Sequence, residues 1–171
     1  MKFTKGYWMN LPGVTNTDAV QVREVKAEND RVYLYTVPYH ADMRAMGGPL
    51  LEMYISSPQP DIIRTEAYHF MGSNQKMPAF ELNDAHCALE VENTETTVTI
   101  KSGNTKLVIG KNPCSFDYYY KDKKLTSIGN RFGNAMISTI STPDGNYMRA
   151  QMNLDIGEKV YGLGERFTPY V

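Results

Sequence analysis

The sequence predicts an all-β, mostly antiparallel β-sandwich, and three observations carry this prediction. Apolar and polar residues alternate with a period of two through roughly ten short segments. Gly, Pro, Asn and Asp fill the breaks between these segments, as expected for turns. No segment has the 3.6-residue period of a helix of typical length. Short strands at this spacing are typical of a sandwich or a barrel.

The predicted strands follow one another along the chain. In residues 31–37, alternate side chains point to opposite faces, with Val32 and Leu34 on one of them. Residues 88–91 and 98–101 form the clearest hairpin, and the next turn leads into 106–109, which predicts a meander. The other predicted strands are residues 51–55, 62–70, 115–120, 125–128, 136–140, 147–154 and 159–163. Loops are expected at residues 42–49 and 71–84.

The length and composition fit a single soluble domain over residues 1–171. The net charge of -1 provides no field that would attract nucleic acid or an anionic membrane. No window approaches the ~20 apolar residues needed to span a bilayer. Cys87 and Cys114 make no disulfide framework, which favours a reducing compartment. We therefore expect a cytoplasmic domain with neither nucleic acid nor a membrane as a partner.

The sequence offers no recognisable catalytic or metal-binding constellation. His40, His69 and His86 stand far apart and lack partners at the spacings of zinc motifs, so no metal or cofactor is predicted. No pair of carboxylates is set by its spacing as a glycosidase pair, and no nucleophile motif occurs. In residues 118–120, alternation sends the central tyrosine to the opposite face, so packing is the favoured role.

The segment 162–167 follows an apolar strand and begins like a dinucleotide-binding loop. The third glycine position is Phe167, however, and Thr168-Pro169 interrupts the helix that would have to follow. Paired glycines let another chain segment approach closely, and a charged pair can form hydrogen bonds at a strand end. We therefore predict a contact with another domain here, made by Tyr161, Gly162, Leu163, Gly164, Glu165, Arg166 and Phe167.

Residues 154–167 resemble the strand-and-turn motif near the end of the N-terminal domain of family 31 glycoside hydrolases. Further matches follow the order found in bacterial α-xylosidases of that family. They are Trp8 with Leu11-Pro12-Gly13, Gly48-Pro49-Leu50, Ser57-Pro58-Gln59, and Arg64 with His69-Phe70. The resemblance covers nearly the whole chain and implies a galactose-mutarotase-like β-sandwich, or supersandwich.

The resemblance also implies an activity for a longer parent chain. Family members are retaining enzymes in which two aspartates, borne by a (β/α)8 barrel, act as nucleophile and as acid and base. We expect that barrel after residue 171 of the parent, an α-xylosidase or α-glucosidase-type enzyme, and we expect the chain alone to be inactive. The expected partners are the barrel, an oligosaccharide bound through the parent, and a second copy through an exposed interdomain surface.

Two alternatives from other classes remain open. A free-standing carbohydrate-binding β-sandwich would use exposed aromatic side chains. A mutarotase-like protein would need a histidine and a carboxylate that converge in a cleft.

Overall fold

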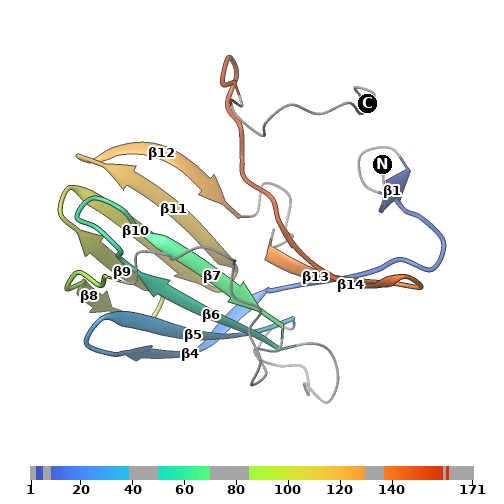
Figure 1. Cartoon of the computed structure of the whole chain (residues 1–171), viewed down its shortest axis with the longest axis horizontal. Coiled ribbons are helices and arrows are strands. Elements are labelled where there is room, and N and C mark those ends of the chain that lie inside the picture. The colour runs from blue at the N-terminus through green and yellow to red at the C-terminus, as the bar shows by residue number, and fades with distance from the viewer. Residues whose placement is uncertain are drawn as a thin grey trace.

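A computed structural model describes residues 3–5, 9–38, 50–69, 85–129, 137–159 and 161. These residues form antiparallel strands and connecting turns, and no helix occurs among them (Figure 1). The strands are β1 (Thr4–Lys5), β2 (Met9–Asn10), β3 (Thr15–Asp18), β4 (Gln21–Ala27), β5 (Arg31–Val37), β6 (Leu51–Ser56), β7 (Arg64–Tyr68), β8 (Glu90–Asn93), β9 (Thr97–Ser102), β10 (Thr105–Lys111), β11 (Cys114–Tyr120), β12 (Lys123–Ile128), β13 (Ile137–Thr142) and β14 (Gly145–Ala150).

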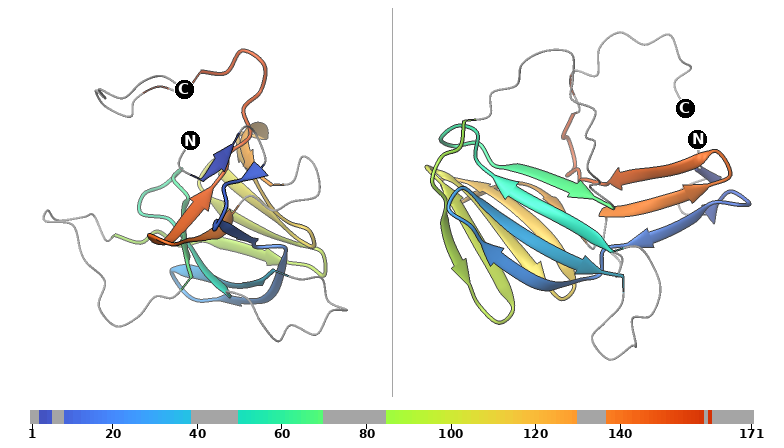
Figure 2. Two further views of the ribbon diagram at one scale, coloured as in Figure 1. Left: turned by 90° about the vertical axis from the view of Figure 1, so that its right-hand side faces the viewer. Right: turned by 60° about the horizontal axis from the view of Figure 1, so that its bottom comes forward.

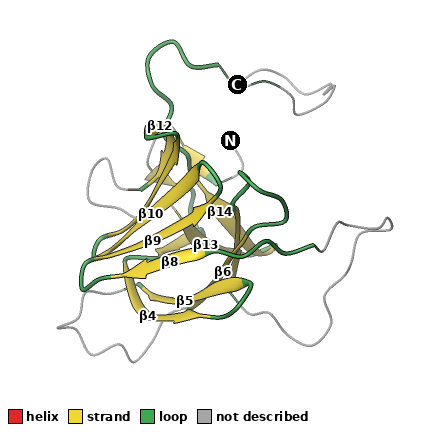
Figure 3. Cartoon of the chain, turned by 90° about the vertical axis from the view of Figure 1, so that its left-hand side faces the viewer, coloured by secondary structure: helices red, strands yellow, loops and turns green. Residues whose placement is uncertain are grey.

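Two sheets form the layers of a sandwich. One has the strand order β4-β5-β6-β7 and the other β12-β11-β10-β9-β8, and every pairing is antiparallel. Figure 3 shows β8, β9 and β10 in one layer facing β4 and β5 in the other. The predicted β-sandwich is confirmed.

The core lies between these two sheets. Val32 and Leu34 of β5 pair with Ile55 and Met53 of β6, and all four side chains are fully buried. The facing sheet contributes Val98, Ile100, Leu107, Ile109 and Phe116. Each such side chain stabilises the fold by about 1.5–3 kcal/mol through removal from water. Because the side-chain period of a strand is two, this burial fixes the register of every central strand.

Polar contacts join the layers at their margin. The Ser57 and Ser102 hydroxyls are 2.6 Å apart in a buried hydrogen bond, and the hydroxyls of Thr65 and Tyr118 are 2.9 Å apart. Buried hydroxyls of this kind are satisfied by one another instead of by water. These hydrogen bonds between side chains of the two sheets fix how one sheet is placed over the other, in addition to the apolar packing between them.

A smaller sheet extends from one side of the sandwich. Its strand order is β14-β13-β3, and Figure 2 shows it beside the two main layers. The amide of Ala19 donates to the carbonyl of Ile137 at 2.8 Å, where the small sheet meets the start of β4. After β14 the chain turns back toward β12, so the small sheet sets where the C-terminal residues begin.

Most predicted strands are present, and the differences are informative. The strand predicted at 31–37 is β5, and the predicted meander is β8-β9-β10. The strand predicted over 147–154 ends at Ala150, and Lys159 and Tyr161 are not in strands. The sequence patterns did not reveal β1 to β4, which are short or polar. The loops expected at 42–49 and 71–84 lie outside the described residues.

Candidate docking surface at the C-terminal arm

Residues 151–159, here called the C-terminal arm, run from β14 to the free edge of β12. Met152 forms an isolated antiparallel bridge with Ile128, and the Asn153 amide donates to the Ser127 carbonyl at 2.8 Å. The Thr126 hydroxyl donates to the Asn153 carbonyl at 3.3 Å. The arm therefore extends the five-stranded sheet by one short segment, which pairs with the edge of β12.

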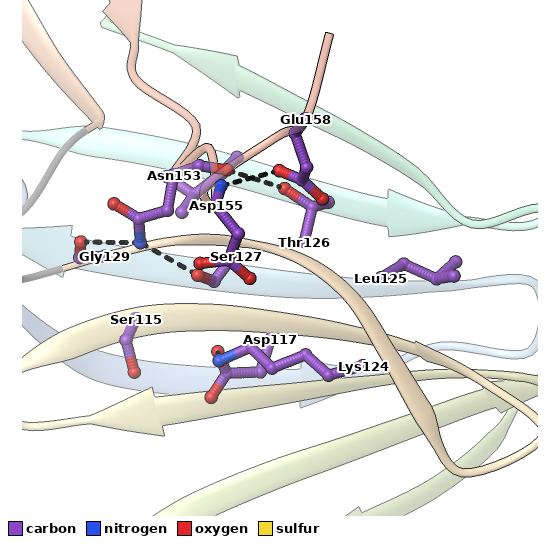
Figure 4. A pocket seen from close by; sticks show the side chains of 11 residues that line it. Ser115, Asp117, Lys124, Leu125, Thr126, Ser127, Gly129, Asn153, Asp155 and Glu158 are labelled. Carbon is purple, nitrogen blue, oxygen red and sulfur yellow. Dashed lines mark hydrogen bonds and ion pairs between the residues drawn. The ribbon is translucent and has the colours of Figure 1, made fainter.

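The side chain of Asn153 fastens the arm to β12. Its Nδ2 donates to the Ser127 hydroxyl at 2.8 Å and to the Gly129 carbonyl at 3.4 Å (Figure 4). An asparagine amide has two N–H donors, so both bonds can form together. Sequence reasoning missed this residue, because its partners lie more than twenty positions away and leave no local pattern.

A tight turn follows at residues 155–158. The Glu158 amide donates to the Asp155 carbonyl at 3.1 Å, and the Asp155 amide donates to the Glu158 carboxylate at 2.8 Å. Gly157 has a φ of 87°, which glycine adopts without steric strain. These bonds satisfy the backbone of the turn locally and leave Ile156 at its tip.

The arm exposes a row of large apolar side chains. Met152 and Leu154 are 55% and 53% exposed, and Ile156 is fully exposed. None of these three side chains is among the described residues that line the polar groove between the arm and strands β11 and β12. Met148 and Tyr161 are exposed as well, so five of the ten exposed large apolar side chains among the described residues lie between 148 and 161. Such concentrations mark interaction surfaces.

A polar groove of about 440 Å³ lies between the arm and strands β11 and β12. Asp117 and Lys124 stand on its floor, and Asp155 and Glu158 enter it from the arm (Figure 4). Lys124 Nζ is 2.6 Å from the Asp117 carboxylate, and this hydrogen bond raises the pKa of the lysine. The groove thus holds three carboxylates and one ammonium group, and one carboxylate is already paired.

The chemistry of the groove is that of a polar contact surface. Its described lining residues include neither a histidine nor a cysteine. Within the described ranges, no three His, Cys, Asp or Glu side chains form a group that could hold a metal ion. Hydroxyl, amide and carboxylate groups can exchange hydrogen bonds with a partner surface, while the neighbouring apolar row supplies buried area.

The two described histidines lie outside the groove. His69 lines a hollow of about 700 Å³ with threonine and serine hydroxyls, and no acidic side chain is among its described lining residues. His86 Nε2 is 4.0 Å from the Asp30 carboxylate at the surface. His40 is outside the described residues.

Of the residues predicted to contact another domain, Tyr161 is described and is 83% exposed. Gly162, Leu163, Gly164, Glu165, Arg166 and Phe167 lie outside the described residues, so their interdomain role stays a prediction.

The fold matches those of larger proteins that act on or bind sugars. The cycloalternan-forming enzyme from Listeria monocytogenes, solved with a pentasaccharide substrate, superposes with a TM-score of 0.56 at 18% identity. That match covers 78% of this chain and 11% of the enzyme. A Listeria monocytogenes EGD-e protein, solved with glucose, magnesium and calcium, gives a TM-score of 0.58 at 16% identity. It covers 81% of this chain and 12% of that protein. These matches show a shared β-sandwich fold.

Sequence comparison identifies the family. The family model for the glycosyl hydrolase 31 N-terminal galactose mutarotase-like domain matches residues 52–171, and the chain belongs to this family. The resemblance seen in residues 154–167 is thereby confirmed at the level of the family.

Two curated relatives match the whole chain. The alpha-xylosidase XylQ of Lactiplantibacillus pentosus is 28% identical over 178 residues, which is 22% of its length. An alpha-xylosidase of Emericella nidulans is 28% identical over 192 residues, which is 24% of its length. The chain spans about a quarter of the length of these relatives. In the part of the chain that the structure describes, no helix is long and apolar enough to cross a membrane.

Proposed function

We propose that the chain is the non-catalytic N-terminal domain of a retaining α-glycosidase of the α-xylosidase type, which removes terminal α-linked xylose from oligosaccharides. The domain packs beside the catalytic barrel of the same cytoplasmic parent and shapes the entrance of its active site. The family membership and the two alpha-xylosidase relatives support this assignment. The oligosaccharide is bound through the parent.

The exposed apolar row on the C-terminal arm carries the docking part of the proposal. Ile156 stands fully exposed at the tip of a hydrogen-bonded turn, where a polar residue would be expected. Burying Ile156 and Leu154 against a second domain would stabilise the interface by about 1.5–3 kcal/mol for each fully covered side chain. The polar groove beside them supplies the hydrogen-bonding rim that interfaces usually have.

The same row predicts how the isolated chain behaves. Without the barrel, exposed apolar side chains favour association between copies. We expect light scattering to detect dimers or larger species as concentration rises. Ile156→Ser should shift the chain toward the monomer, whereas Ile62→Ser, at a 46% exposed site between β6 and β7, should leave the association unchanged.

Two outcomes would contradict the proposal. Turnover of an aryl α-xyloside by the chain alone, above a buffer control, would place catalysis within these residues and not in a separate barrel. A monomeric wild-type chain at high concentration, or equal effects of the two isoleucine variants, would remove the arm as the docking surface.

A further inference from the structure

The outer face of the four-stranded sheet carries a regular array of aromatic and charged side chains. In β5, β6 and β7 the register places Arg31, Ser56 and Arg64 in one row across the strands. The next two rows are Tyr33, Tyr54 and Glu66, and then Tyr35, Glu52 and Tyr68. The residues between them along each strand point into the core, so these nine side chains share the face turned away from it.

The tyrosine rings form a connected band. The ring centroids of Tyr33 and Tyr54 are 5.4 Å apart, and those of Tyr54 and Tyr68 are 6.1 Å apart at an interplanar angle of 67°. The Tyr68 hydroxyl donates to Glu66 at 3.0 Å, which fixes the orientation of both side chains. Rings held in this way present a preformed surface to a ligand.

A hollow of about 160 Å³ opens beside this band. Its described lining residues include two aromatic side chains, those of Tyr54 and Tyr68, together with both arginines and His86. The Arg31 guanidinium lies over the Tyr54 ring, 5.1 Å from its centroid. Arg64 Nε donates to the buried Ser56 hydroxyl at 3.1 Å and lies 3.5 Å from the Glu66 carboxylate. These contacts hold the guanidinium group in place before any ligand arrives.

The charges around the hollow cancel in pairs. Arg31 Nε is 2.6 Å from the Glu28 carboxylate, and Arg64 is paired with Glu66. A phosphate or a carboxylate would therefore meet no excess positive charge, although guanidinium groups are the usual ligands for such anions. Paired guanidinium and carboxylate groups instead offer donors and acceptors side by side. That combination suits a neutral ligand rich in hydroxyl groups.

The size of the hollow and its aromatic lining residues limit the class of ligand further. Pockets for drug-sized molecules usually measure about 300–1,000 Å³, so this hollow accepts one small ring. The C–H face of a pyranose packs on an aromatic ring, while its hydroxyls need hydrogen-bond partners at the rim. We propose that this outer face binds a single neutral pyranose unit, with Tyr68 contacting the ring and Arg64 and Glu66 its hydroxyls.

This sugar subsite is independent of the docking role proposed for the C-terminal arm. It uses β5 to β7, whereas the arm lies on the edge of β12 in the other sheet. The arm could fail as a docking surface while the hollow still binds sugar, and the reverse also holds.

The test is a titration of the ¹⁵N-labelled chain with methyl α-D-xylopyranoside, followed by amide chemical shifts. We expect saturable shifts at the residues around the hollow, with a dissociation constant on the order of millimolar, as for a small ligand with few contacts. Arg64→Gln and the isosteric Glu66→Gln should each weaken binding at least fivefold. Lys101→Gln, at an exposed site on β9 of the other sheet, should leave the affinity unchanged.

Urea unfolding of each variant separates loss of binding from loss of structure. If Arg64→Gln unfolds, Glu66→Gln still tests the site, because glutamine keeps the shape of the glutamate side chain. The proposal is overturned by an absence of saturable shifts up to about 100 mM sugar, which is far above the expected affinity range. It is also overturned if both variants bind like the wild type. Displacement of the sugar by inorganic sulfate would show an anion site and would overturn the proposal too.

Discussion

Replacing Asn153 with alanine should release the C-terminal arm without unfolding the sandwich. The substitution removes the bond from Nδ2 to the Ser127 hydroxyl at 2.8 Å and the longer bond to the Gly129 carbonyl at 3.4 Å. A typical hydrogen bond contributes about 1 kcal/mol net, and one at the longer distance contributes less. The expected loss of free energy is therefore about 1–1.5 kcal/mol, and it weakens the attachment of the arm to β12.

Hydrogen exchange measures this local loss. The Asn153 amide is protected by its 2.8 Å bond to the Ser127 carbonyl, and exchange at that site requires the arm to open. Since 1.4 kcal/mol corresponds to a factor of ten, Asn153→Ala should accelerate exchange at residue 153 about five- to tenfold. Amides in β5 should exchange as in the wild type, because they open only with the core.

Matched variants decide whether the effect belongs to these bonds. Asn146→Ala changes an exposed asparagine in β14 and should leave exchange in the arm unaltered. In a double-mutant cycle, Asn153→Ala and Ser127→Ala should show a coupling energy of about 1 kcal/mol. Unchanged exchange at residue 153, or a fall of more than about 2 kcal/mol in global stability, would refute the reasoning.

Two further predictions concern the core and a turn. Burial raises the pKa of Cys114 to about 12 from 9.0, so at pH 8 a thiol reagent should modify the half-buried Cys87 quickly and Cys114 only on unfolding. The folded state holds the Cys114 proton more tightly, so the contribution of Cys114 to the free energy of unfolding should be constant below pH 9 and should fall as pH rises toward 12. Equal labelling of both cysteines in the folded protein would contradict the burial of Cys114. Gly103→Ala should destabilise the fold by about 1–3 kcal/mol in urea unfolding, because φ there is 57° and the new Cβ would collide with the Asp61 carboxylate. In an Asp61→Ala background the same glycine substitution should cost less, and an unchanged loss there would show that the collision is unimportant.

The tyrosine array shows where sequence reasoning stops. Alternation in β5 predicts that Tyr33 and Tyr35 share a face, and this follows from the strand period alone. That Tyr54 and Tyr68 continue the band depends on the register of β6 and β7. Register is set by which side chains enter the core, so no single strand contains this information.

Two strands that escaped prediction did so for different reasons. β3 has the sequence Thr-Asn-Thr-Asp, which has no apolar alternation, and it is a strand because it pairs with β13 more than a hundred residues away. In β4 a shift of register follows Val22, which interrupts the period of two. Thus the strand character of β3 depends on a partner distant in the chain, whereas that of β4 is obscured by an irregularity within the strand itself.

The sequence by itself determined the all-β class, most of the strands of the two main sheets, and the family resemblance, because strand periodicity, turn residues and motifs are all local. Only the tertiary structure decided that Asn153 ties the arm to β12, that Ile156 stands exposed at the tip of a turn, and that one tyrosine band spans three strands. The physical reason is that hydrogen bonds and packing between distant segments select one pairing and one register. The surface that a second domain or a sugar would meet exists only after that selection.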